Sequence, residues 1–140
     1  ATRFGLIWQS SGQEVKFTDE RLEAGRNFCN KIWNAARLVF NSISDSGLSV
    51  TDLEDAPKLI ESEGGFAERW ILARLDRVIS NTEASLQRDR FDEAARGIQE
   101  FFWGEFCDWY LEIAKTQITS SDTEPSPPKR AVQAALAFVL

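Results

Sequence analysis

The fold class is decided by one stretch of sequence, FTDERLEAGRNFCNKIWNAARLVF at residues 17–40. Thr18 is a favourable helix N-cap, and Asp19 and Glu20 complement the positive end of the helix dipole. Apolar residues then recur at steps of three and four, which predicts a single helix over residues 18–44. The predicted apolar positions are Leu22, Phe28, Cys29, Ile32, Trp33, Ala36, Val39, Phe40 and Ile43.

Further helices are predicted after this one. Residues 45–66 are polar and interrupted by proline and glycine, which indicates a loop that could contain one short helical turn after Thr51. Helices over residues 67–88 and 92–119 follow, and the second is apolar almost all round, which is typical of a central position in a bundle. Residues 120–129 hold three of the four prolines and predict irregular structure, before a last helix that starts near Pro128. The expected fold is all-α, an antiparallel helical bundle.

Composition excludes several classes of protein. The chain has 140 residues, of which 43% are hydrophobic and 27% charged, as in ordinary globular domains. No apolar run approaches the roughly 20 residues that a membrane-spanning helix needs. With no His and only Cys29 and Cys107, we expect no metal site, no catalytic histidine, and two cysteines that are buried. The net charge of −6 argues against nucleic-acid binding unless the basic residues gather on one face.

One candidate binding site lies on the predicted helix of residues 18–44. Cationic side chains there can hold phosphates, and asparagines can read base edges or cap neighbouring backbone. The candidates are Arg26, Asn27, Lys31, Asn34, Arg37 and Asn41, of which the three asparagines and Lys31 share one stripe. The same pattern is also typical of a solvated helix face with internal ion pairs, such as Glu23 with Arg26.

A second set of candidates is acidic. Glu100, Glu105, Asp108 and Glu112 lie on the predicted helix of residues 92–119. Paired carboxylates can perform acid–base or metal chemistry, but di-iron bundle sites use Glu-x-x-His pairs, and the chain has no His. We therefore expect these acids to pair with arginines of the first two long helices and to hold the bundle in register.

Aromatic side chains form a third set. Unpaired bases commonly stack on aromatic rings, for which Phe40, Trp70 and Tyr110 are candidates. Aromatic residues at helical spacing are more often part of a core, and spacing alone does not choose among them.

Several of these stretches resemble valyl-tRNA synthetases. RNFCNKIWNAARLVF at residues 26–40 is similar to the stretch that this family carries after its Lys-Met-Ser-Lys-Ser loop. AERWILARL at 67–75 and FFWGEFCDWYLEIAK at 101–115 are similar to its next two helices. The resemblance extends over about residues 1–119 and, more weakly, 129–140.

The resemblance implies a class I ligase that joins valine to its tRNA in the cytoplasm with ATP and Mg. It implies catalytic and editing domains before residue 1, so the chain lacks the catalytic motifs and is expected to be inactive alone. Residues 1–17 would join the catalytic domain, and residues 18–140 would form a C-terminally truncated anticodon-binding bundle that contacts a valine tRNA through the helix of residues 26–37. Apolar surface left by the last helix could allow the fragment to dimerise. The alternative is a helical protein-interaction module without RNA contact, which the net charge favours.

Overall fold

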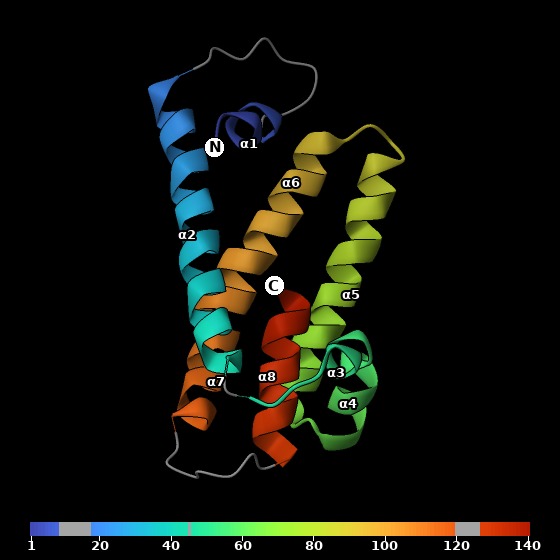
Figure 1. The fold of residues 1–140 in the computed structure, drawn as a ribbon. Helices are drawn as coiled ribbons and strands as arrows, with labels where there is room; N and C mark the ends of the chain where they lie inside the picture. The colour runs from blue at the N-terminus through green and yellow to red at the C-terminus, as the bar shows by residue number, and fades with distance from the viewer. Residues whose placement is uncertain (9–17, 45, 120–126) are drawn as a thin grey trace.

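The computed structural model describes residues 1–8, 18–44, 46–119 and 127–140, and these residues form helices and no strand (Figure 1). The all-α helical bundle is therefore confirmed. The helices are α1 (Thr2–Ile7), α2 (Asp19–Ile43), α3 (Val50–Glu54), α4 (Ala56–Glu63), α5 (Phe66–Leu86), α6 (Phe91–Glu100), the π-helix η1 (Phe101–Tyr110), α7 (Leu111–Ile118) and α8 (Pro127–Val139).

Three long rods form the frame of the bundle. They are α2, α5 and the continuous rod of α6, η1 and α7, and α8 lies between them (Figure 1). The three rods agree with the predicted long helices to within two residues at each end. Helix α8 packs against α2, α4, α5 and α7, so the last helix completes the core. Among the described residues, no helix has both the length and the hydropathy that crossing a bilayer requires.

The middle of the third rod departs from α-helical geometry. Residues 101–110 form a π-helix, and the backbone N–H of Leu111 donates to the carbonyl of Phe106, five residues earlier. Because a π-helix bonds i to i+5, residues four and five apart share a face. The buried residues of this segment follow that spacing: Phe101, Phe102, Phe106, Cys107, Tyr110 and Leu111. The segment is consequently buried on one side, and not all round as predicted, since Trp109 is 66% exposed.

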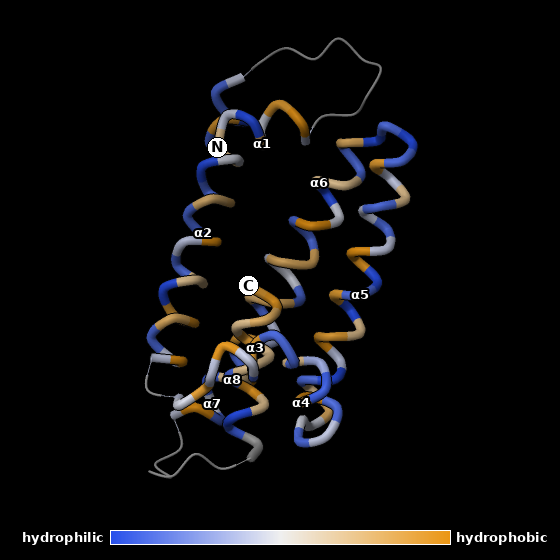
Figure 2. The backbone as a smooth tube through the Cα atoms, turned by 45° about the vertical axis from the view of Figure 1, so that its right-hand side comes forward, coloured by the Kyte–Doolittle hydropathy of each residue, from blue (hydrophilic) through white to orange (hydrophobic). Residues whose placement is uncertain are grey.

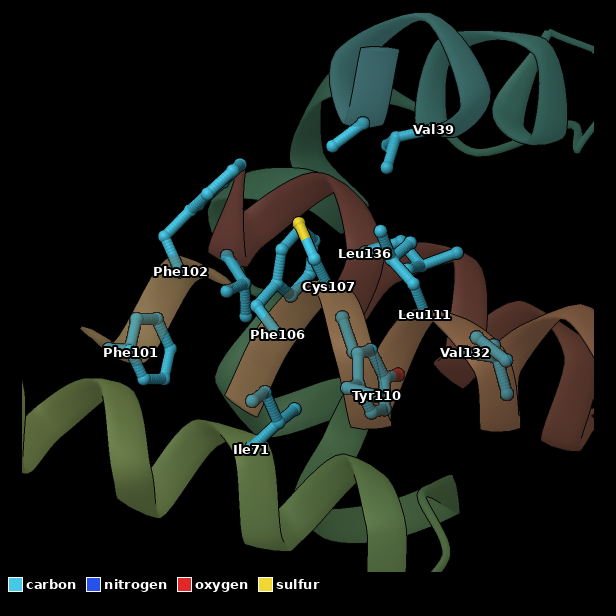
Figure 3. Close-up of a cluster of buried hydrophobic side chains, with 14 of the residues drawn as sticks. Val39, Ile71, Phe101, Phe102, Phe106, Cys107, Tyr110, Leu111, Val132 and Leu136 are labelled. Carbon is cyan, nitrogen blue, oxygen red and sulfur yellow. The ribbon is translucent and has the colours of Figure 1, made fainter. Parts of the chain in front are cut away.

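These side chains form the centre of the core. Phe106 and Tyr110 are fully buried, and Phe106 packs against Phe102 and Tyr110 with ring centroids 5.4 and 6.1 Å apart. Figure 3 shows Ile71 of α5 on one side of this row and the α8 residues Val132 and Leu136 beside it. Apolar and polar residues alternate along α2 and α5 (Figure 2), as amphipathic helices at the edge of a core require.

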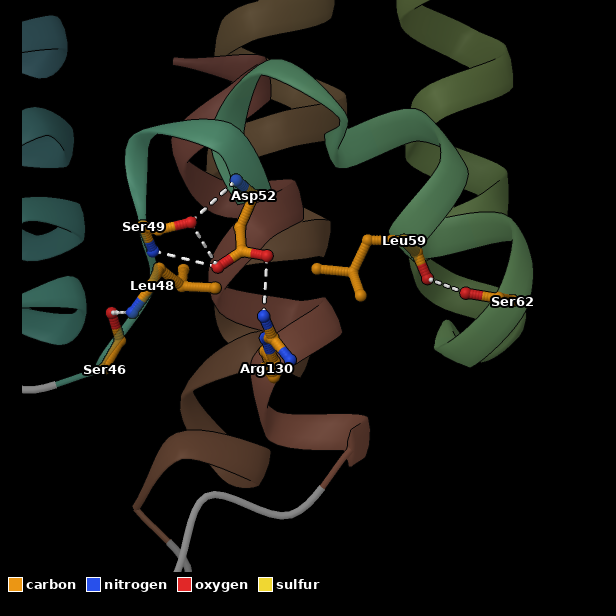
Figure 4. Close-up of polar contacts among 7 residues, drawn as sticks. All are labelled: Ser46, Leu48, Ser49, Asp52, Leu59, Ser62 and Arg130. Carbon is orange, nitrogen blue, oxygen red and sulfur yellow. Dashed lines mark hydrogen bonds and ion pairs between the residues drawn. The ribbon is translucent and has the colours of Figure 1, made fainter.

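The loop predicted for residues 45–66 is wrong in part: α3 lies where one short helical turn was predicted after Thr51, but α4 was not predicted, and the two helices occupy most of the segment. Helix α3 starts at a capping box in which Ser49 and Asp52 exchange hydrogen bonds (Figure 4). Arg130 of α8 donates to the other oxygen of Asp52 at 2.6 Å, so the segment is tied to the last helix. Ala56 and Ile60 of α4 are buried. The polar composition of this segment made helices hard to predict. A short helix needs few apolar residues to be stable when another helix packs against it.

Helix α1 lies against the start of α2, inside the segment predicted to be a junction, whose residues 9–17 are outside the described part of the chain. The two helices approach closely because Gly25 of α2 has no side chain at their contact. A Cβ at Gly25 would lie 2.5 Å from the carbonyl oxygen of Ala1, so a larger residue would displace α1. Thr18 is the N-cap of α2 as predicted, although its side chain makes no capping hydrogen bond.

Candidate nucleic-acid interface

Five of the six candidates on α2 lie on the side of the helix that faces away from the core, and Lys31 lies at the edge of that side. The buried residues of this helix are Gly25, Phe28, Ala35 and Val39. Five of the candidates are exposed, namely Arg26, Asn27, Asn34, Arg37 and Asn41, and Lys31 is half-buried at the edge of the buried face. The structure therefore brings all six together on one helix surface.

Two aromatic residues of α2 also face solvent. Trp33 is 72% exposed and Phe40 is 61% exposed, although periodicity placed both in the core. They are seven residues apart and therefore lie on one side of the helix, with Arg37 four residues after Trp33 and three before Phe40. The buried stripe of α2 is narrower than predicted: its buried residues are Gly25, Phe28, Ala35 and Val39, and the predicted positions Cys29, Ile32, Trp33 and Phe40 are exposed. Of the other proposed stacking residues, Trp70 is half-buried and Tyr110 is fully buried, so Tyr110 cannot contact a base.

Charge is distributed unevenly along the chain. Residues 24–44 of α2 and its C-cap contain three cations, Arg26, Lys31 and Arg37, and no acidic residue, although the whole chain has a net charge of −6. Arg26 pairs with Glu23 at 3.2 Å, and both side chains are more than 60% exposed, so the pair is weak. Arg37 makes no ion pair with any residue that the structure describes. Its guanidinium is therefore open to an anionic ligand.

Lys31 is held in place by the π-helix. Its Nζ donates to Oδ1 of Asp108 at 3.0 Å and lies 5.1 Å from the centroid of the Trp103 ring. The Trp103 ring in turn stacks on Phe28, with an interplanar angle of 15°. An ion pair and a cation–π contact thus fix the ammonium group. The Lys31 side chain is 31% exposed and that of Asp108 is 50% exposed, so solvent still reaches the pair.

The other acidic candidates make separate contacts. Glu105 accepts two hydrogen bonds from Arg74 of α5, each 2.6 Å long, in a bidentate pair that also raises the pKa of the guanidinium. Glu112 pairs with Lys115 of its own helix. Pairing with an arginine of another long helix therefore occurs at Glu105, whereas Asp108 pairs with a lysine and Glu112 stays within α7.

The cysteines are not equivalent. Cys107 is buried as predicted, and burial raises the pKa of its thiol to about 11. Cys29 is exposed, which corrects the prediction that both are buried. Among the described residues, no group of three or more His, Cys, Asp and Glu side chains is placed to hold a metal ion.

Comparison with known proteins identifies the family of this fold. A family model described as the anticodon-binding domain of tRNA ligase matches residues 68–140, just over half of the chain. The chain is 40% identical over 135 residues to the valine–tRNA ligase of Dechloromonas aromatica, a match that covers 94% of the chain and 14% of that protein. It is 38% identical over 156 residues to that of a Nostoc species and 36% identical over 141 residues to that of Bacillus cereus.

The two latter matches cover 100% of the chain and 15% of each relative. The chain therefore spans about one seventh of the length of the relatives that it matches. No solved structure matches it.

Proposed function

The chain belongs to the family of anticodon-binding domains of tRNA ligases, and on this premise we propose that it seats the anticodon stem-loop of a valine tRNA. The whole protein would be a valine–tRNA ligase that acts in the cytoplasm and uses ATP and Mg in domains outside this chain. The function of this part is then positioning: it holds one end of the tRNA so that the other end reaches a distant active site.

The observation that carries the proposal is the outward face of α2. Residues 24–44 contain three cations and no acidic residue within an acidic chain, and Arg37 has no ion-pair partner among the described residues, which weakens the objection raised by the net charge. Electrostatic attraction to phosphates depends on local potential, so one cationic surface is sufficient. Asn34 and Asn41 can accept and donate hydrogen bonds at base edges, and the exposed rings of Trp33 and Phe40 offer stacking surfaces beside Arg37.

A matched pair of variants tests the proposal. We expect Arg37→Ala to weaken binding of a valine tRNA transcript by the full-length protein, and to lower the slope of log affinity against log salt by about one unit. The control is Arg77→Ala, which removes the same charge from an exposed position of α5. Equal affinities and equal salt slopes for Arg37→Ala, Arg77→Ala and wild type, in folded proteins, would overturn the placement of the tRNA on α2.

Contact with another polypeptide is a second candidate function, and a groove favours it. Apolar residues of the three helices α4, α5 and α8 line a hollow of about 540 Å³. Its lining includes Ile60, Leu72, Leu75, Ile79 and Phe138. We propose that the groove receives another part of the same polypeptide or, in the isolated chain, a second copy. Sedimentation of the isolated chain distinguishes the two, because only the second gives a concentration-dependent dimer.

A further inference from the structure

We propose that the exposed face of α5 is a two-fold interface, at which a second copy of the protein docks with its own α5 in antiparallel orientation. The interface includes the groove between α4, α5 and α8, and it assigns that groove to a second copy. The inference does not depend on contact with tRNA, because α2 and α5 lie on opposite sides of the bundle (Figure 1).

The first observation is a pair of opposite charges on α5. Arg69 and Asp76 are both exposed, and their spacing of seven residues places them on one side of the helix. That spacing corresponds to about 10 Å along the helix axis, which is too far for an ion pair between them. Neither forms an ion pair with any residue that the structure describes, although Arg69 donates one hydrogen bond to the carbonyl of Gly64. Both charges are therefore available to a partner.

This face of α5 is complementary to a copy of itself. A two-fold axis between Leu72 and Ala73 places two antiparallel copies of α5 so that each residue faces the one equally far on the other side of the axis. Arg69 then faces Asp76 of the second copy, and by symmetry the same pair forms twice. Leu72 and Ala73 face each other at the centre, where the small alanine lets the two helices approach. In a parallel arrangement Arg69 would face Arg69 and be repelled, so the charges select the antiparallel orientation.

The same register brings an exposed ring to an apolar hollow. Phe66 is 88% exposed, more than any other large apolar residue that the structure describes. The position that faces it in the second copy is Ile79, which lines the hollow of about 540 Å³ together with Leu75 and Phe138. Each copy thus offers one ring and one hollow to the other. An aromatic anchor in a pocket with charged residues at its rim is typical of protein interfaces.

An exchange of charges tests this register. Arg69→Glu and Asp76→Arg each place like charges opposite each other at two symmetry-related sites, whereas the double variant restores both pairs with their signs reversed. Phe66→Ala removes the aromatic anchor. The controls are Arg96→Glu and Phe91→Ala, which change the same residue types at exposed positions of α6. All five side chains are exposed, so every variant should keep the wild-type circular dichroism spectrum and nearly its melting temperature.

Sedimentation of the full-length protein from about 1 to 100 μM measures the association, because interfaces of modest size dissociate in this range. We expect wild type to form a reversible dimer. Its dissociation constant should rise at least about tenfold in each single charge variant and in Phe66→Ala. The double charge variant should return to within about threefold of wild type, because the two changes compensate each other. The two control variants should leave the dissociation constant unchanged.

Three results would overturn the inference. A full-length protein that stays monomeric at about 100 μM leaves the groove to another part of the polypeptide. A dimer that none of the α5 variants weakens forms through another surface. A double variant that associates as weakly as the single ones shows that Arg69 does not face Asp76. Binding of a valine tRNA transcript is measured on the same proteins, and its absence in wild type would count against the proposed function and not against the dimer.

Discussion

The strongest structural prediction concerns Phe106, which lies in the middle of the π-helix and is fully buried. Replacing it with Ala removes a ring that packs against Phe102 and Tyr110 and leaves a cavity in the core. Truncation of a buried Phe costs about 3–5 kcal/mol, a large part of the total stability of a domain. For a chain of this length that corresponds to a melting temperature lower by roughly 10–17 °C.

The control is Trp109→Ala, three residues away. Although Trp is the larger side chain, Trp109 is 66% exposed, and surface substitutions usually change stability by less than about 0.5 kcal/mol. Thermal unfolding of wild type and both variants, followed by circular dichroism and calorimetry, gives the comparison. The contrast depends on the π-helical register, because an α-helical continuation of α6 would turn position 109 relative to the core.

Two outcomes would refute the reasoning. If Trp109→Ala destabilises the protein as much as Phe106→Ala, the register of the π-helix differs from the one described. If Phe106→Ala shifts the melting temperature by only a few degrees, the centre of the core does not lie at the contact between η1, α5 and α8.

Two further predictions concern titration. At pH 8, exposed Cys29 should react with a thiol reagent, whereas Cys107 should react only on unfolding, because burial raises the pKa of its thiol to about 11. Mass spectrometry of the modified peptides measures both reactions, and equal modification of the two cysteines in the folded protein would contradict the prediction. Hydrogen bonds from Arg130 and from the Ser49 cap lower the pKa of Asp52 to about 2, below its ordinary value of 3.8. Since the folded-state pKa is depressed, the stabilisation is present above pH 4 and is lost as the pH falls towards 2. The stability of Asp52→Asn should fall less than that of wild type over that interval, and parallel pH profiles from denaturant titrations would refute this.

The positions of the long helices were predictable because their signals are local. Acidic residues at the start of α2, apolar steps of three and four, and breaks at glycine and proline all act within a few residues of the chain. Helix α4 was not predicted, for the complementary reason. Burial of Ala56 and Ile60 comes from packing against α8, which lies more than 60 residues later in the chain, so no local pattern predicts it.

The candidate site was predictable in its composition but not in its contacts. The sequence placed six polar candidates on one helix, and the structure shows that helix face open to solvent. Trp33 was assigned to the core, since periodicity counts a large apolar residue near the stripe as buried. The partner of Lys31 was equally hidden: Asp108 was expected to pair with an arginine, and its neighbour is set by how the π-helix lies against α2.

One signal in the sequence did indicate the π-helix. The apolar pairs Phe101–Phe102, Phe106–Cys107 and Tyr110–Leu111 are spaced by five and four residues, which is too wide for an α-helical stripe. The same residues were interpreted as all-round apolarity, because an α-helix of this composition would indeed show apolar residues on every side.

By itself, the sequence determined the helical class, the extents of the three long rods, the resemblance to valyl-tRNA synthetases and the helix that carries the binding candidates. Helix formation depends on hydrogen bonds and side-chain spacing within a few residues, so the local sequence is sufficient to predict it. Only the tertiary structure decided which aromatic residues are buried and which cations are paired. The burial and the ion pairing of a side chain depend on residues from distant parts of the chain. The packing of those residues leaves Trp33 and Arg37 exposed and holds Lys31 against Asp108.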